Sequence, residues 1–165
     1  DSVNVNKHPI TATMTVFDAI DGPENTYYTY EVPMDDLVWE PGDSTATFLD
    51  YECQNATADY HGRRWTAWFA IDIPVSEGPW QLHGLPGLIL MAESDGGEYR
   101  FTATGLYECT EPINDMPGNP DADKTTRKEF LKIKEDFTKH PSKAYGIIGR
   151  EPPMFHDLIE TDYKD

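Results

Sequence analysis

Four apolar residues in succession, Leu88-Ile89-Leu90-Met91, follow directly on the turn sequence Leu85-Pro86-Gly87, in a chain whose other predicted strands meet water on one side. Proline presets φ near about −65° at the second turn position and glycine tolerates a positive φ at the third, so these residues predict a type II turn. A strand that is apolar on both sides must be covered on both sides. What covers this strand is therefore the main structural and functional question that the sequence raises.

The other predicted strands carry β-branched and aromatic residues with a period of two, which is typical of strands half exposed to water. The first two are separated by the breaker Asp21-Gly22-Pro23 and predict an antiparallel hairpin. A hairpin signal, Asp95-Gly96-Gly97, precedes the last one. The predicted strands are residues 11–17, 27–32, 45–53, 63–73 and 99–107.

One helix is predicted at residues 126–139. Thr126 and Glu129 form a capping box at its start, and His140-Pro141 ends it. Phe130, Ile133 and Phe137 recur at helical spacing, so one face of this helix must dock on another element. We expect it to lie on the strand at 88–91 and to supply the second cover which that strand requires.

These elements predict a mainly β (α+β) fold: a single curved antiparallel sheet, or a partly open barrel, with one C-terminal helix packed on it. At 165 residues the chain is expected to form one domain over 1–165. The tail after residue 144 carries enough apolar residues to pack but shows no clear period. They are Ile147, Ile148, Met154, Phe155, Leu158 and Ile159.

The charge balance excludes several classes of partner. With 30 acidic and 13 basic residues the formal net charge is −17, which repels nucleic acid and anionic membrane surfaces. The 38% hydrophobic and 12% aromatic content is too high for a disordered acidic chain. No apolar stretch is long enough to span a membrane. Because Asp1 follows neither a methionine nor a leader, we expect a mature or trimmed form.

Two places in the sequence are candidates for ligand binding. The loop at 74–87 is rich in proline and glycine, so it either has a purely architectural role or presents side chains at the rim of a site. On the predicted strand 63–73, one arginine and one tryptophan share the face opposite the core residues, where they are exposed, covered by the helix or lining a concave site. The candidate ligand-binding residues are Arg64, Trp68, Trp80, Leu82 and His83.

No pattern in the sequence predicts a metal site, a cofactor or a catalytic residue. The five histidines lack the i, i+2 or i, i+4 spacing of metal ligands. Asn119, Asp121, Asp123 and Thr125 have the spacing of calcium ligands, but a lysine replaces the turn glycine and a phenylalanine replaces the bidentate glutamate. Nucleophile motifs and phosphate-binding glycine loops are absent.

The chain has two cysteines, Cys53 and Cys109. In an exported protein two cysteines often pair, whereas in a cytosolic protein they more often remain buried free thiols. The residues alone leave the disulfide open.

Four blocks in succession resemble the GLPGLI family, which comprises exported proteins of Bacteroidetes. The blocks are YECQNAT at 51–57, GRRWTAWF at 62–69, DIPVSEGPW at 72–80 and GLPGLIL at 84–90. The resemblance covers about residues 39–107 and thus identifies a single GLPGLI-type domain. Members often have lysine where this chain has Asn55, and they commonly begin with a longer N-terminal region behind a signal peptide.

The resemblance implies export to the periplasm or cell envelope, and export favours a disulfide between Cys53 and Cys109. The resemblance identifies no catalytic residues in this chain. Antiparallel strands with one covering helix are also similar to the half-barrel of periplasmic lipoprotein carriers, an analogy at the level of the fold.

Our leading hypothesis is a non-catalytic envelope protein that binds an apolar small molecule or a partner segment in the concavity of the sheet. The alternative is a protein–protein interaction subunit of an envelope complex, in which the sheet interior is filled by its own side chains. A third is a hydrolase without a recognisable motif.

Overall fold

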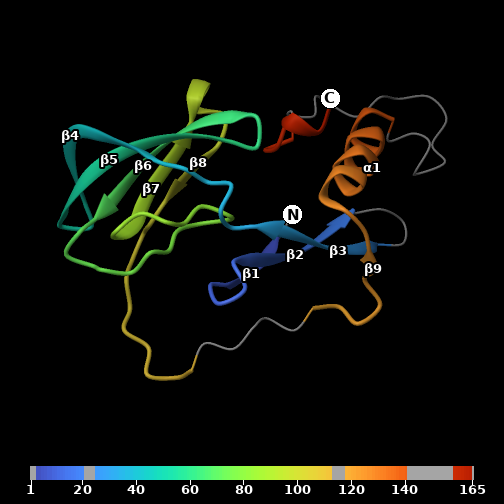
Figure 1. The fold of residues 1–165 in the computed structure, drawn as a ribbon, viewed down its shortest axis with the longest axis horizontal. Helices are drawn as coiled ribbons and strands as arrows, with labels where there is room; N and C mark the ends of the chain where they lie inside the picture. Colours follow the sequence, from blue (N-terminus) through green and yellow to red (C-terminus); the bar gives the residue numbers. More distant parts are fainter. Residues whose placement is uncertain (1–2, 21–24, 113–117, 141–157, 165) are drawn as a thin grey trace. The chain divides into compact units, whose positions relative to one another are not determined.

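The computed structural model describes residues 3–20, 25–112, 118–140 and 158–164. The chain is mainly β with one C-terminal α-helix, as the sequence predicts, and its strands form two sheets (Figure 1). It divides into two compact units: Asp1–Met34 with Asp115–Asp165, and Asp35–Asn114. The tail residues Ile147, Ile148, Met154 and Phe155, which we expect to pack, lie outside the described residues.

The first unit contains a four-stranded sheet with the order β1-β2-β3-β9. Along β2 partly buried and buried residues alternate, so Met14 and Val16 reach the core while the threonines between them stay half exposed. Strands β2 and β3 pair antiparallel, which confirms the predicted hairpin. The strands are β1 (Asn4–His8), β2 (Thr13–Ile20), β3 (Thr26–Pro33) and β9 (Asp123–Lys124).

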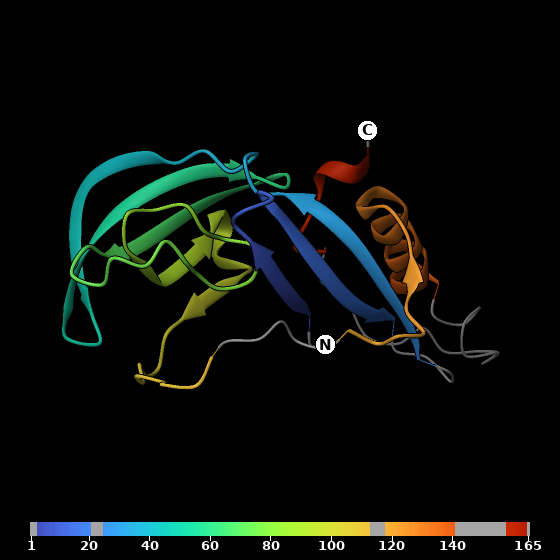
Figure 2. The same ribbon diagram turned by 60° about the horizontal axis from the view of Figure 1, so that its bottom comes forward.

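Helix α1 (Arg127–Lys139) begins at the predicted capping box, in which the Thr126 side chain accepts from the N–H of Glu129 and the Glu129 carboxylate accepts in return. Its buried face lies on β3, beside which it is drawn in Figure 2. The Phe130 ring lies 5.3 Å from the rings of both Tyr28 and Tyr30. The helix thus completes the core of the first unit. Our expectation that it covers residues 88–91 is wrong, because Phe130, Leu131 and Phe137 pack on the apolar face of β2 and β3, while the predicted stripe residue Ile133 is exposed.

The second unit contains a five-stranded antiparallel sheet with the order β4-β5-β6-β7-β8. Where a strand at 45–53 was expected, the chain turns at Leu49 and Asp50, both at positive φ, and makes a hairpin. The strand expected at 99–107 pairs only as far as Thr102. The elements are β4 (Glu40–Phe48), β5 (Tyr51–Tyr60), β6 (Arg63–Ala70), β7 (Leu88–Ser94), η1 (Asp95–Gly97) and β8 (Arg100–Thr102). Two separate sheets therefore replace the single curved sheet or partly open barrel of the sequence-based prediction.

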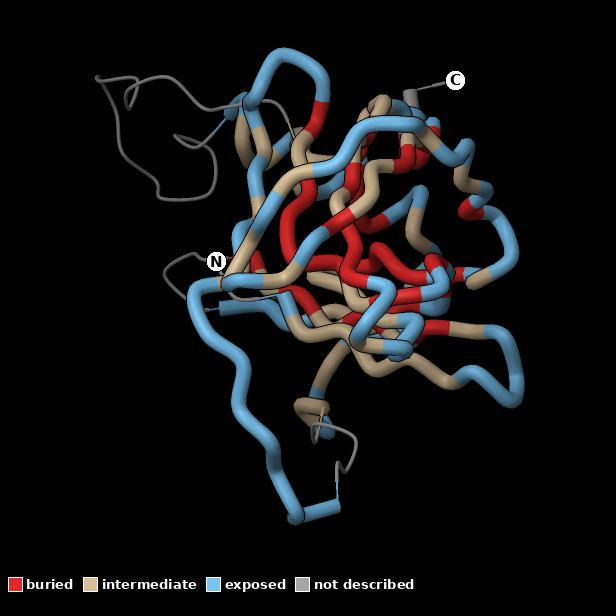
Figure 3. Tube along the Cα trace, turned by 90° about the vertical axis from the view of Figure 1, so that its left-hand side faces the viewer, coloured by how far each residue is buried: buried red, intermediate tan, exposed pale blue. Residues whose placement is uncertain are grey.

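Strand β7 is buried on both faces, as its sequence predicts; buried positions are red in Figure 3. On one face Leu90 joins Cys53 and Ala70 in a small core. On the other face the loop between β6 and β7 covers Ile89: a Cβ built on Gly78 would lie only 2.7 Å from Cδ1 of Ile89. The loop between β6 and β7 therefore covers the second face of this strand.

The turn before β7 differs from the predicted type II geometry. The glycine with a positive φ is Gly84, at +91°, and Gly87 is not in the left-handed region. Gly87 is required for a different reason: a Cβ built on it would lie 2.1 Å from the carbonyl oxygen of Ala70. Since Ala70 pairs with Leu88, this glycine lets the end of β6 approach the start of β7.

Candidate functional site

Strand β7 has a short partner on its outer edge. Strand β8 pairs only with Met91–Glu93, and beyond it the Ala103 N–H donates to the carbonyl oxygen of Leu90 at 2.8 Å. The loop residue Glu77 lies at the same end of β7, where its carbonyl oxygen accepts a hydrogen bond from the Ile89 N–H. The start of β7 thus forms a floor between two separate segments of chain.

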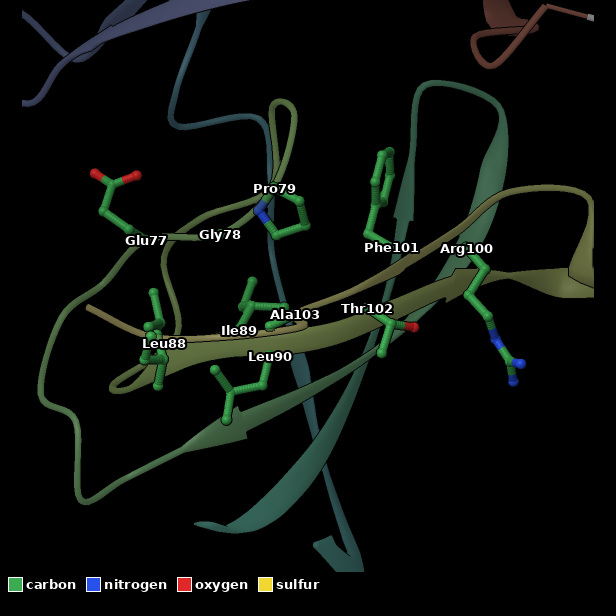
Figure 4. A pocket seen from close by; sticks show the side chains of 11 residues that line it. Glu77, Gly78, Pro79, Leu88, Ile89, Leu90, Arg100, Phe101, Thr102 and Ala103 are labelled. Atoms are coloured by element: carbon green, nitrogen blue, oxygen red, sulfur yellow. The ribbon is translucent and has the colours of Figure 1, made fainter. Parts of the chain in front are cut away.

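A pocket of about 570 Å³ lies above this floor (Figure 4). Its walls come from the loop at 77–79 and from the segment at 100–106, and apolar side chains make up most of its lining. Ligand pockets commonly fall between about 300 and 1,000 Å³ and are mostly apolar. The lining residues are Glu77, Gly78, Pro79, Leu88, Ile89, Leu90, Arg100, Phe101, Thr102, Ala103 and Leu106.

The loop wall is held close to the floor by Gly78. A Cβ at this position would lie 2.7 Å from Cδ1 of Ile89 and 3.0 Å from the carbonyl oxygen of Leu82, so only glycine fits without a shift. Backbone bonds close the loop on itself: Leu82 donates to Pro79 at 3.0 Å, and Glu77 and His83 form an isolated antiparallel bridge. Backbone bonds and the close approach of Gly78 thus fix the position of this wall.

Three of the predicted site residues, Trp80, Leu82 and His83, lie in this same loop. Leu82 and His83 are buried, and the carbonyl oxygen of His83 accepts from Nε1–H of Trp39 at 2.7 Å. The Trp80 ring lies 5.6 Å from the ring of Trp65. None of these three residues lines the pocket.

The other two predicted site residues lie elsewhere in the same sheet. Arg64 donates to the carboxylates of Glu40 at 2.8 Å and Asp59 at 3.0 Å, and these partners raise its pKa. The Trp68 ring packs 6.0 Å from the ring of Phe48. Neither residue lines the pocket.

None of the lining residues is among the five predicted site residues, and the far wall with Phe101, Ala103 and Leu106 also lies outside the loop and the strand that the sequence singles out. Those three residues belong to a predicted strand, 99–107, whose side chains we expected to alternate between core and water. The available signal was the doubly apolar run at 88–91, because a floor of that kind requires cover on its outer edge as well.

The predicted disulfide is not formed in the structure, in which Cys53 is a buried free thiol and Cys109 an exposed one. Burial raises the pKa of the Cys53 thiol, although a backbone hydrogen bond opposes this shift. A thiolate is the reactive form, so a buried thiol with a raised pKa is unreactive.

We therefore expect iodoacetamide at neutral pH to label Cys109 in the folded protein and Cys53 only in denaturant. Mass spectrometry of tryptic peptides measures this order, and Cys109→Ser should abolish labelling of the native state. If neither thiol is labelled in denaturant until a reductant is added, the two cysteines are paired and the free-thiol assignment is wrong.

The stretch with calcium-like spacing forms an ordinary turn before β9. The Asp121 N–H donates to Oδ1 of Asn119 at 2.9 Å, and the Ala122 N–H donates to the carbonyl oxygen of the same residue at 3.0 Å. Within the described parts of the chain, no three His, Cys, Asp or Glu side chains gather as metal ligands would. In the same parts, no helix is both long and apolar enough to cross a membrane.

Comparisons with known proteins give a family match and a likeness of fold. Residues 59–91 match a family described as "Protein of unknown function (Porph_ging)", which supports a Bacteroidetes-type family. The match spans about a fifth of the chain and includes the loop wall and the floor of the pocket. No curated protein matches the sequence.

PNGF-II is similar to this chain in two solved structures. In space group P21 the identity is 15%, the TM-score 0.58, and the alignment covers 79% of this chain and 24% of PNGF-II. In space group C2 the values are 16%, 0.56, 80% and 24%. The chain thus spans about a quarter of the length of the protein it resembles. At this identity the likeness concerns the fold alone, and the comparisons leave the pocket as the feature from which a function can be argued.

Proposed function

We propose that this chain is an exported, non-catalytic protein that binds an apolar ligand in the pocket beside β7. The observation that carries the proposal is the pocket itself, about 570 Å³, which is lined by the start of β7, the loop at 77–79 and the segment at 100–106. Burying apolar surface stabilises a complex by roughly 25 cal/mol per Å², so such a lining favours an apolar occupant.

The fixed position of the loop wall supports a binding role. Binding loses free energy when flexible groups must be ordered, and a wall already fixed by backbone bonds avoids part of that loss. Glu77 is one of the lining residues, and its carbonyl oxygen accepts the hydrogen bond from Ile89 that ties the loop to β7. The same residues thus close the loop and shape the pocket.

The chemistry of the lining favours binding over catalysis. Among the described residues that line the pocket there is no His, Cys or Ser, and Arg100 donates to Glu93 from both Nε and Nη2. Hydrolysis needs a nucleophile within reach of a base, or an acid and a base that face one substrate. Export and membership of the GLPGLI family as a single domain over 1–165 are part of the proposal, supported by the four sequence blocks described above.

We expect the neutral hydrophobic probe N-phenyl-1-naphthylamine to bind the protein with enhanced fluorescence, and Leu106→Gln to weaken that binding about tenfold. Leu106 lines the pocket while it is partly exposed, so the change removes apolar contact without emptying the core. Losing a contact worth about 1.4 kcal/mol changes a dissociation constant tenfold.

Tyr107→Gln is the matched control, because Tyr107 is 94% exposed, adjacent in sequence and outside the lining. Its dissociation constant should equal that of the unchanged protein. The proposal is contradicted if the unchanged protein shows no saturable binding of the probe. It is also contradicted if Leu106→Gln and Tyr107→Gln weaken that binding equally.

A further inference from the structure

The sheet of the second unit has an open edge at strand β8, the last strand in the order β4-β5-β6-β7-β8. The Ala103 N–H donates to the carbonyl oxygen of Leu90 in β7 at 2.8 Å. Because the backbone groups of successive residues point to opposite edges of a strand, the N–H and C=O of Arg100 and Thr102 point away from β7. In the part of the chain that the structure describes, no strand pairs with this outer edge.

The pocket meets β8 along this open edge. Its lining includes the four consecutive residues Arg100, Phe101, Thr102 and Ala103. Successive side chains of a strand point to opposite faces, and Figure 4 shows the Phe101 ring on the side of Pro79 and the Arg100 and Thr102 side chains on the other side. A pocket that all four residues line therefore extends across an edge of the strand. Since β7 occupies one edge, the edge in the pocket is the open one.

An open edge of this kind selects an extended polypeptide. A hydrocarbon offers no partners to the outward N–H and C=O groups of Arg100 and Thr102, whereas an added antiparallel strand bonds to all of them. The side chain of the added strand that lies opposite Phe101 would share its face, with the two Cβ atoms about 5 Å apart. The Phe101 ring is already positioned by stacking on Trp65, with 6.0 Å between the ring centroids.

We propose that the pocket binds an extended segment of a partner polypeptide, which adds to β8 as an antiparallel strand and places one aromatic or aliphatic side chain beside Phe101. This inference rests on the proposed function, because it uses the same apolar pocket. The net charge of −17 disfavours an acidic segment, so the partner segment carries basic residues around its apolar one.

The first test uses the peptide acetyl-Lys-Val-Thr-Phe-Thr-Val-Lys-amide, whose binding is measured by displacement of N-phenyl-1-naphthylamine. When its phenylalanine lies opposite Phe101, the N–H groups of both threonines point to β8 and that of the phenylalanine points away. N-methylation of either threonine should weaken binding about fivefold, the effect of one backbone hydrogen bond. N-methylation of the phenylalanine is the matched control and should leave the affinity unchanged.

The second test changes the protein. Thr102→Pro should also weaken the peptide about fivefold, because proline removes an N–H that points to the added strand and none that bonds to β7. Thr47→Pro is the matched control, since Thr47 lies outside the lining in β4, the other edge strand of the same sheet. Its N–H also points outward, because Phe48 and Tyr51 close the two-residue hairpin as the bonded pair. This variant should bind the peptide as the unchanged protein does.

The outcomes separate this inference from the proposed function. If the dye itself does not bind, the apolar pocket is wrong and the inference fails with it. If the dye binds but the peptide does not displace it, or if methylation of threonine and of phenylalanine has equal effects, the pocket stands and the polypeptide ligand is overturned. Equal peptide affinities of Thr102→Pro and Thr47→Pro would overturn it as well.

Sedimentation velocity tests a second copy of this chain as the occupant of the open edge. We expect the unchanged protein to sediment as a monomer. A dimer that Thr102→Pro dissociates would show that the added strand comes from a second copy, and the assignment to a partner polypeptide would then be wrong.

Discussion

Gly87→Ala is expected to destabilise the protein by about 3 kcal/mol, because the added methyl group overlaps backbone atoms that cannot move independently. The new Cβ would lie 2.1 Å from the carbonyl oxygen and 2.6 Å from the carbonyl carbon of Ala70. These atoms belong to the last residue of β6, which pairs with Leu88. Relief of the overlap requires the two strands to separate at the place where the pocket floor begins.

Urea denaturation followed by tryptophan fluorescence measures this change, since Trp65 and Trp68 both lie on β6. Gly96→Ala is the matched control. An alanine at this position is strained because φ is +83°, but nothing lies within 4 Å of the Cβ built there. It should cost only about 1 kcal/mol, the strain of the left-handed region. Equal losses in the two variants would show that the close approach to Ala70 is not what requires glycine.

The strands and the helix could largely be predicted from the sequence because their signals are local. Met14 and Val16 alternate with threonines, and the capping box of Thr126 and Glu129 marks the first turn of α1. The burial of β7 on both faces also follows from its composition alone. In each case the residues that set the pattern are those that the element itself contains.

The docking of the helix could not be predicted because more than one apolar face was available to it. The stripe around Phe130 fits the sheet of β2 and β3 as well as it would fit β7, and helical periodicity does not distinguish between them. Local backbone geometry decides the rest: a loop that contains Gly78 can lie flat on Ile89, so β7 needs no helix.

The candidate site shows the same division between local and long-range information. The floor of the pocket was evident from Leu88–Leu90, whereas the far wall depends on where β8 stops pairing. Trp80 and Leu82 were selected because their loop is constrained, and they do lie in that loop. Neither side chain lines the pocket, and turn residues alone do not specify on which side of a loop a side chain lies.

Arg127→Met is expected to cost about 3 kcal/mol of stability in the first unit, because it removes the guanidinium partner of a buried carboxylate. Arg127 donates from Nε to Glu160 and from Nη2 to Asp162, and the Glu160 side chain is only 3% exposed. Burial alone would lower the pKa of Arg127, yet the charges and hydrogen bonds of the two carboxylates outweigh it and raise that pKa. The ion pair thus holds residues 158–164 against the start of α1, with Tyr163 in the core.

Thermal unfolding of three variants separates the loss of this pair from other effects. Arg64→Met removes an arginine that also contacts two carboxylates, but these are 69% and 77% exposed, so it should cost much less stability than Arg127→Met. The double variant Arg127→Met with Glu160→Met should recover most of the stability, since apolar groups of similar volume can replace a buried ion pair at little cost. If the double variant is as unstable as Arg127→Met alone, the loss comes from packing of the arginine side chain, and the carboxylate left behind is not its cause.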